Sequence, residues 1–144
     1  MELQDVDPFE EEVQILKNTT TDKTIEVEKI LEIQDILDIQ NLIKKVPVSD
    51  NVYDYVVSLV SKTRNKGSEI ANKYLQWGAG PRASQYLIMG AKAHAVLNGK
   101  YSPDIEDVNA IAVATLRHRI VLNYEAQANG YTAETIIKEL IKSK

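Results

Sequence analysis

The residues of this sequence best suited to chemistry lie in a glycine-rich turn that leads into a helix. Residues 77–83 read WGAGPRA, so that Pro81 and Arg82 directly follow two closely spaced glycines. Glycine adopts backbone angles that other residues resist, and proline has the fixed φ that suits the first position of a helix. We therefore expect a helix that begins at Pro81 and carries Arg82 in its first turn.

Arg82 is the candidate ligand for an anion. A cation in the first turn of a helix opposes the helix dipole, at a cost of only ~0.3–1 kcal/mol where the side chain is exposed. A bound anion would meet the free backbone N–H groups and the guanidinium together, and a charge pair at ~4 Å contributes up to about 4 kcal/mol at an effective dielectric constant of about 20. A solvated arginine, or one paired with a carboxylate, also fits the turn on its own. The candidate site comprises Gly80, Pro81, Arg82 and Ala83.

The helix that carries Arg82 is expected to end at Asn98-Gly99, since both residues tolerate the left-handed conformation found after helix C-termini. Residues at spacings of three and four share one face of a helix, and this face is expected to pack against the core. It consists of Ala83, Leu87, Gly90 or Ala91, His94 and Leu97.

Five further segments have the apolar spacing and capping residues typical of helices: 8–18, 33–46, 52–66, 103–119 and 133–141. Between them, residues 19–24 predict a loop, residues 25–28 a short strand or extended arm, and residues 68–77 a connector that is partly helical. The expected caps are Asp7, Ser49 or Asp50, Ser102 and Thr132. The helical spacing places the following residues together on one face of each helix: Phe9, Val13 and Leu16; Ile33, Ile36, Leu37, Gln40, Ile43 and Lys44; Val52, Tyr55, Val56, Leu59 and Val60, which should face the core; Ile105, Val108, Ile111, Ala112 and Leu116; and Ile136, Ile137, Leu140 and Ile141.

The composition favours an all-α fold. Aromatic residues make up 6% of the chain and glycine and proline are few, whereas a β-sandwich or barrel is usually rich in them. A chain of 144 residues can form one domain with a core of its own. We therefore predict a compact helical bundle that accommodates, at most, a short extended segment or a minimal β pair.

Charge and residue types exclude several classes of function. The chain has 17 Lys and Arg against 21 Asp and Glu, a net charge of −4 that does not favour broad attraction to nucleic acid or to anionic membranes. It has no cysteine and two histidines, which leaves few ligands for a metal. No apolar run approaches the ~20 residues that span a bilayer, and the first twelve residues are acidic. We expect a cytoplasmic protein without a metal site or membrane insertion.

Catalysis by this chain alone is not expected. The sequence lacks a GxxxxGK phosphate loop, an HExxH pair and a GxSxG turn. Its carboxylates lie at helix starts and on polar faces, where capping and solubility explain them.

A basic cluster, Arg117-His118-Arg119, falls near the end of a predicted helix. On a helix the two arginines would point about 160° apart, so at most one of them faces an anion shared with Arg82. For His118 a hydrogen-bonding role at the helix end and a ligand or proton-transfer role are both open, whereas His94 is expected to be structural.

Four stretches together resemble the C-terminal lid domain of the MoxR branch of the AAA+ ATPases. They are residues 48–56 (VSDNVYDYV), 78–83 (GAGPRA), 101–108 (YSPDIEDV) and 116–126 (LRHRIVLNYEA). Four motifs in the same order are much more specific than one, and they cover the chain from about Leu31 to its C-terminus. Residues 7–18 resemble the stretch that leaves the ATPase core.

The resemblance implies that residues 31–144 form the lid and that residues 1–30 connect it to an ATPase core. It implies that Arg82 is the family's second sensor arginine, with ATP and Mg²⁺ held mainly by that core and no cofactor bound to the lid alone. It also implies rings of subunits, commonly hexamers, with a chaperone-like activity that often serves von Willebrand factor A domain partners. Gly80 stands where the family often has serine, and residues 18–29 are longer and more irregular than expected.

Two other hypotheses fit parts of the sequence. The chain could form a stand-alone helical adaptor that binds proteins through apolar grooves and makes no use of nucleotide. A helical nucleic-acid-binding domain is the third hypothesis, although the negative net charge counts against it. Its cations would be Lys62, Arg64, Lys66, Arg117 and Arg119.

Overall fold

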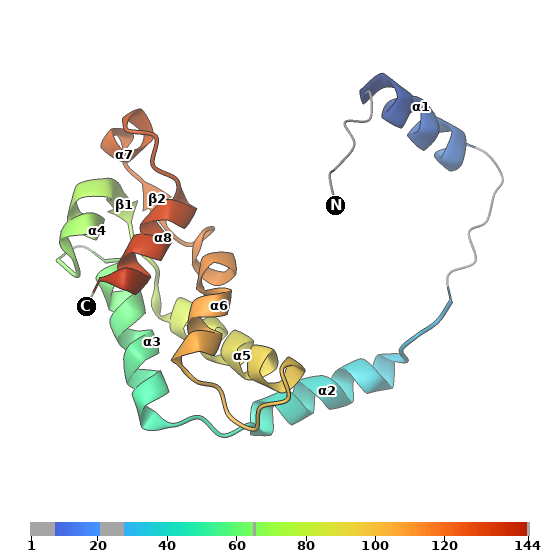
Figure 1. Cartoon of the computed structure of the whole chain (residues 1–144), viewed down its shortest axis with the longest axis horizontal. Coiled ribbons are helices and arrows are strands. Elements are labelled where there is room, and N and C mark those ends of the chain that lie inside the picture. Colours follow the sequence, from blue (N-terminus) through green and yellow to red (C-terminus); the bar gives the residue numbers. More distant parts are fainter. Residues whose placement is uncertain (1–7, 21–27, 65, 144) are drawn as a thin grey trace. The chain divides into compact units, whose positions relative to one another are not determined.

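The computed structural model describes residues 8–20, 28–64 and 66–143 (Figure 1). The chain divides into two units, residues 1–32 and residues 33–144. The first unit contains helix α1 (Pro8–Thr19), on which the side chains of Phe9 and Leu16 are exposed. Its expected cap, Asp7, lies outside the described residues, as do most of the predicted loop and the extended arm.

The second unit consists of helices and one minimal sheet. Strand β1 (Leu75–Trp77) pairs antiparallel with β2 (Val121–Leu122). The predicted all-α fold, with its minimal β pair, is therefore confirmed. The helices are α2 (Ile33–Lys45), α3 (Asp50–Lys62), α4 (Glu69–Tyr74), α5 (Pro81–Leu97), α6 (Ile105–Leu116), α7 (Tyr124–Ala128) and α8 (Ala133–Lys142).

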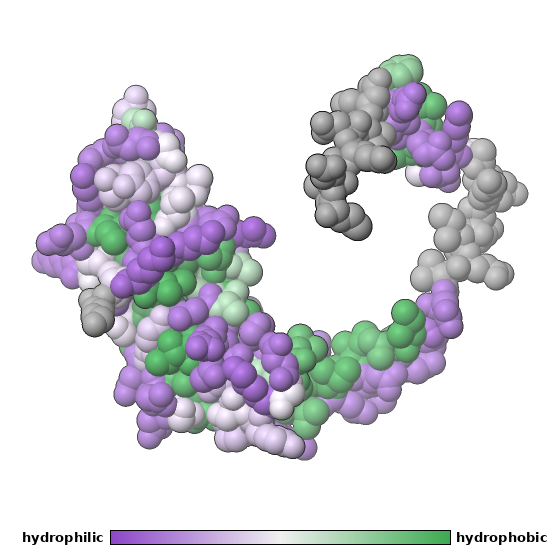
Figure 2. Space-filling view, viewed as in Figure 1, coloured by the Kyte–Doolittle hydropathy of each residue, from purple (hydrophilic) through white to green (hydrophobic). Residues whose placement is uncertain are grey.

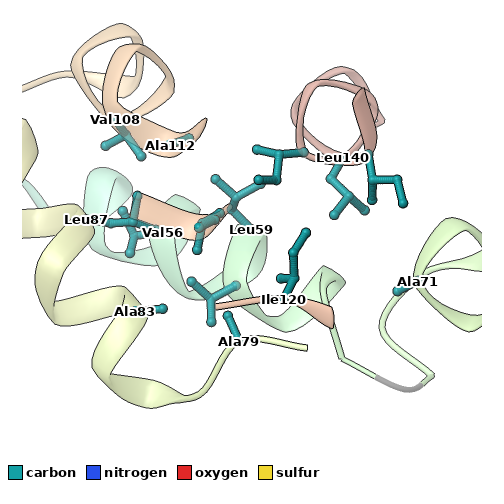
Figure 3. Close-up of a cluster of buried hydrophobic side chains, with 14 of the residues drawn as sticks. Val56, Leu59, Ala71, Ala79, Ala83, Leu87, Val108, Ala112, Ile120 and Leu140 are labelled. Atoms are coloured by element: carbon teal, nitrogen blue, oxygen red, sulfur yellow. The ribbon is translucent and has the colours of Figure 1, made fainter. Parts of the chain in front are cut away.

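Helices α3, α5, α6 and α8 share one hydrophobic core (Figure 3). The side chain of Ile111 on α6 packs directly on the backbone of α5, because a Cβ added to Gly90 would lie only 3.1 Å from Cδ1 of Ile111. Most of the residues expected on the core faces of α3, α6 and α8 are buried. The largest fully buried apolar side chains are Val52, Val56, Val60, Leu87, Val108, Leu116, Ile136, Ile137 and Leu140.

The buried face of α5 is narrower than the sequence predicts. Its buried apolar residues recur at every fourth position from Ala83 to Ala95, which gives a stripe of small side chains around Leu87. Leu97, expected on this face, is 86% exposed, and His94 lies at its edge. Small residues suffice here because α6 packs close to the α5 backbone.

Two helix ends differ from the prediction. Helix α3 ends at Lys62, well before Gly67, because Thr63 turns its hydroxyl back to the carbonyl of Val60. Helix α6 begins after Asp104 rather than after Ser102, because Asp104 and Asp107 form a reciprocal capping box. The connector 68–77 is partly helical, as expected, since it forms α4 and then β1.

Helix α2 forms where predicted but buries none of its residues. Ile33, Ile36 and Leu42 are exposed, and Ile43 is half-buried. In the space-filling view the apolar side chains form a continuous band along this helix (Figure 2). The predicted helix is therefore present, and its apolar face is not packed into the core among the described residues except near the C-terminal end of α2.

Candidate functional site

The turn before α5 is held in place by two residues that follow α3. The N–H of Ala79 donates to the hydroxyl oxygen of Thr63 at 2.9 Å, and Nε of Arg64 donates to the carbonyl of Ala79 at 2.9 Å. Thr63 and Ala79 are buried, so water competes little for the bond between them. The side chains of Ala79 and Ala83 face the core (Figure 3). The N–H and the carbonyl of Ala79 are thus both held by hydrogen bonds, which fixes the backbone that leads to Arg82.

The two glycines of the turn have different roles. A Cβ on Gly78 would lie 2.1 Å from the carbonyl oxygen of Thr63, so this position requires glycine. Gly80 has φ −82° and ψ 176° and no neighbour within 4 Å of an added Cβ, so another residue fits there. The expectation that both glycines serve special backbone angles is wrong: the first permits close packing, and the second is an ordinary N-cap.

The start of α5 is where the sequence predicts it, with Gly80 as the N-cap and Pro81 at the first position. Pro81 has no N–H, and the N–H of Ala83 donates to the carbonyl of Gly80 at 2.9 Å. In the described part of the chain, the N–H groups of Gly80 and Arg82 have no hydrogen-bond partner. The helix start therefore offers these two backbone donors, with no acidic residue in its first turn.

The side chain of Arg82 is exposed. Within residues 8–20, 28–64 and 66–143, it forms no hydrogen bond and no ion pair. Among the described residues, a rigid turn thus presents an unpaired guanidinium and two free N–H groups at the surface of the bundle. This set of groups fits a phosphate or another anion.

The basic cluster after α6 lies in a turn. The expectation that it continues the helix is therefore wrong. Arg119 donates to the carbonyl of Thr115 at 2.6 Å, contacts His118 and stacks on the ring of Tyr86 at 4.7 Å. Tyr86 follows Arg82 by four residues on α5, so Arg119 lies on the same side of that helix as Arg82.

Arg117 is exposed and has a different neighbour. It helps to lower the pKa of Glu134 on α8, after the larger effect of the Lys138 ion pair. The two arginines of the cluster therefore have different neighbours, Glu134 for Arg117 and Tyr86 for Arg119.

A shallow pocket of about 280 Å³ lies beside the turn. Its walls include Arg64, the exposed ring of Trp77 and the backbone of residues 78–80. Thr63, which anchors the turn, was not predicted from the sequence, because nothing local connects it with Ala79, sixteen residues later. Arg64 was predicted only as part of a basic surface.

His94 belongs to a separate polar network between α5 and α6. Its Nδ1 lies 2.7 Å from Oδ1 of the fully buried Asp107, whose other oxygen accepts from Lys100 at 3.2 Å. Lys100 also pairs with Asp104 at 2.8 Å, and this pairing helps to lower the Asp104 pKa to about 2 and raises that of Lys100. These contacts support a structural role for His94.

The described residues contain no group of three or more His, Cys, Asp or Glu side chains that could hold a metal ion. Among these same residues, no helix is both long and apolar enough to cross a membrane.

Comparison with known families decides what this domain is. The family model of the AAA lid domain matches residues 67–140, a range that includes the turn and Arg82. The chain belongs to the AAA lid family. Within that family the lid is of the MoxR type, because it is 33% identical over 93 residues to the chaperone MoxR1 of Mycobacterium tuberculosis, covering 62% of this chain and 25% of that protein.

Two further relatives agree with this assignment. The uncharacterized protein YeaC of Bacillus subtilis is 33% identical over 101 residues, which are 70% of this chain and 30% of YeaC. A crystal structure from Cytophaga hutchinsonii, assigned as an ATPase, superposes with a TM-score of 0.77 at 34% identity and covers 99% of this chain and 44% of that one. The lid sequence spans less than a third of the length of the curated relatives it matches.

Proposed function

We propose that the lid works with an ATP-binding core in a longer chain, and that Arg82 is its sensor for the nucleotide phosphates. The observation that carries this proposal is the exposed guanidinium of Arg82, which has no partner among the described residues and follows a turn fixed by Thr63 and Arg64. ATP and Mg²⁺ are held mainly by the core, and the lid adds one cation and the N–H groups of Gly80 and Arg82. Pro81 and Ala83 position these groups.

Arg82 can couple the nucleotide to lid motion only if its contact with the nucleotide differs between the ATP and ADP states. It must interact more favourably with one nucleotide state than with the other, because a ligand shifts a conformational equilibrium only by its differential affinity. The γ-phosphate supplies this difference, since it is present in ATP and absent from ADP. The packed helices of residues 50–142 then move together with α5.

We further propose the assembly that the MoxR type implies. Lids and cores of neighbouring subunits form a cytoplasmic ring, commonly a hexamer. The ring acts as a chaperone-like activator, with von Willebrand factor A domain proteins among its partners.

The Arg82→Ala variant in the longer ATPase tests the role of this arginine. A hydrogen bond to a charged group contributes about 1.5–3 kcal/mol, so we expect ATP turnover to fall by at least about tenfold. The melting temperature should stay near that of the parent, because the side chain is exposed and forms no hydrogen bond or ion pair in the described part of the lid.

Arg117→Ala is the matched control, since it removes another exposed arginine that faces α8 instead. Its turnover should equal that of the parent. Equal turnover in R82A and the parent would show that Arg82 has no part in the ATPase cycle.

The other two hypotheses account for less of the structure. The hypothesis of a basic surface for nucleic acid is weakened, because Arg64 donates a hydrogen bond to Ala79 and Arg119 stacks on Tyr86. An adaptor role is consistent with the apolar groove lined by Tyr53, Val57 and Met89, yet it leaves the anchored turn and Arg82 without a purpose.

A further inference from the structure

Lys92 on α5 is a buried charged residue outside the candidate site. Only 8% of it is exposed, and its Nζ donates to the carbonyl oxygen of Lys44 at 3.0 Å. Lys44 lies in the last turn of α2. A side chain of α5 therefore reaches across to the C-terminal end of a different helix.

The Lys92 ammonium and the carbonyl at the C-terminal end of α2 are electrostatically complementary. A buried ammonium is costly unless a polar group accepts its hydrogen bonds. The last turn of a helix has carbonyl groups without partners and a partial negative charge, which favours a cation. Lys92 thus adds a hydrogen bond and a positive charge from another helix to the C-terminal end of α2, which also carries Lys44 and Lys45.

Helix α2 is held to the bundle mainly near its C-terminal end, where the hydroxyl of Ser102 also donates to the carbonyl oxygen of Pro47 at 3.2 Å. The helix buries none of its own residues, and it packs against α5 near its C-terminal end while its N-terminal part projects outward (Figure 1). Ile43 and Val46, both half-buried, are the apolar residues at this end. The bond from Lys92 lies at the same end, so it has a large share in setting the direction of α2.

We propose that Lys92 is a positioning residue that fixes α2 to α5, so that α2 follows the helix on which Arg82 lies. Ten residues separate Arg82 from Lys92, about 15 Å along the helix axis. Helix α5 then links the phosphate-sensing arginine at one end with α2, which leads back toward residues 1–32. The consequence for ATP turnover rests on the proposed function, whereas the attachment of α2 does not.

The distance between α2 and α5 tests the attachment directly. The chain has no cysteine, so the pair Asn41→Cys and Gln85→Cys, both at exposed positions, accepts spin labels at two known sites. We expect one narrow distance distribution in the parent. Lys92→Met keeps the apolar stem but removes the ammonium, and the ratio of detached to attached α2 should rise about tenfold, which broadens the distribution.

Two controls separate the hydrogen bond from charge and packing. Lys92→Arg keeps a cation of similar length and should restore the narrow distribution. Lys45→Met removes an exposed cation from the same turn of α2 and should have no effect. Parent-like distances in K92M, with a cooperative thermal transition, would overturn the proposal.

A second variant covers the case in which K92M does not fold. Lys92→Gln keeps a polar head group in the buried position but is too short to reach Lys44 as lysine does. It should broaden the distribution, and an unchanged distribution in folded K92Q would equally overturn the proposal.

The attachment of α2 by Lys92 and the sensor role of Arg82 are tested by separate measurements, so either proposal can be wrong without the other. The distance measurement uses this chain without nucleotide, so it does not depend on Arg82. In the longer ATPase, K92M should lower kcat about tenfold with the KM for ATP unchanged, since Lys92 touches no nucleotide. If R82A left turnover intact while K92M still released α2, the sensor role would be wrong and the attachment would stand.

Discussion

The close packing of the candidate site requires a residue without a side chain at Gly78. Its backbone lies against the carbonyl of Thr63, where a Cβ would be only 2.1 Å from the oxygen. Gly78→Ala should therefore destabilise the lid by ~1–3 kcal/mol, as overpacking does in other cores. Chemical denaturation of the 144-residue chain, followed by circular dichroism, measures this difference.

Gly80→Ser is the matched control for this prediction. Position 80 has room for a side chain, and serine is a good N-cap, so G80S should be at least as stable as the parent. If G78A and G80S had the same stability, the close approach of residues 63 and 78 would not matter for the fold.

At the level of residues, local rules predict the start of α5 but not what holds it. Pro81 after glycine indicates a helix start from neighbouring residues alone, and the structure agrees. Thr63 and Arg64 contact the turn from fifteen or sixteen residues away, and no spacing rule connects them with Ala79. Such contacts depend on how the chain folds back on itself.

At the level of elements, the start of α6 gives a prediction for the pH dependence of stability. The ion pair with Lys100 is the largest cause that lowers the Asp104 pKa from 3.8 to about 2. A carboxyl with a lowered pKa in the folded state stabilises the fold above its ordinary pKa, and this contribution is lost as the pH falls through the lowered value. The lid should therefore lose stability from this group between about pH 4 and about pH 2.

Asp104→Asn isolates this contribution, because asparagine still caps the helix but does not titrate. The parent should melt at a higher temperature than D104N at neutral pH, and the gap should close as the pH approaches about 2. Asp50→Asn, in the first turn of α3 with no ion pair among the described residues, should change melting much less. A gap between parent and D104N that stayed constant over this range would contradict the prediction.

Periodicity identifies the helices well but fixes their ends and partners poorly. The sequence placed the start of α6 after Ser102, because Ser-Pro is a good start signal, but the Asp104–Asp107 capping box prevails. The amphipathic pattern of α2 correctly predicts a helix, yet most of its apolar face is exposed in this chain. A pattern shows that a face is apolar and leaves open what covers it.

At the level of the whole molecule, the lid is a packed helical unit that carries the exposed guanidinium of Arg82 at the start of α5. Helices α3, α5, α6 and α8 share a core of fully buried side chains, so a force on Arg82 is transmitted to a rigid body. The sequence predicts this bundle because apolar periodicity and the order of motifs extend over most of the chain. Under the proposed function, the rest of the ATP site belongs to the core of the longer chain, and Arg82 adds one cation to it.

Nucleotide affinity of the 144-residue chain follows from this incompleteness. A single charged contact contributes up to about 4 kcal/mol, whereas association costs at least ~4 kcal/mol in lost translational and rotational freedom. We therefore expect no saturable binding of ATP below about 1 mM in a calorimetric titration of the chain. At millimolar ATP and low salt, only the amide resonances near Arg82 should shift in NMR spectra, and R82A should abolish these shifts. Micromolar affinity would mean that the lid has a nucleotide pocket of its own, and Arg82 would then not depend on a separate core for its phosphate.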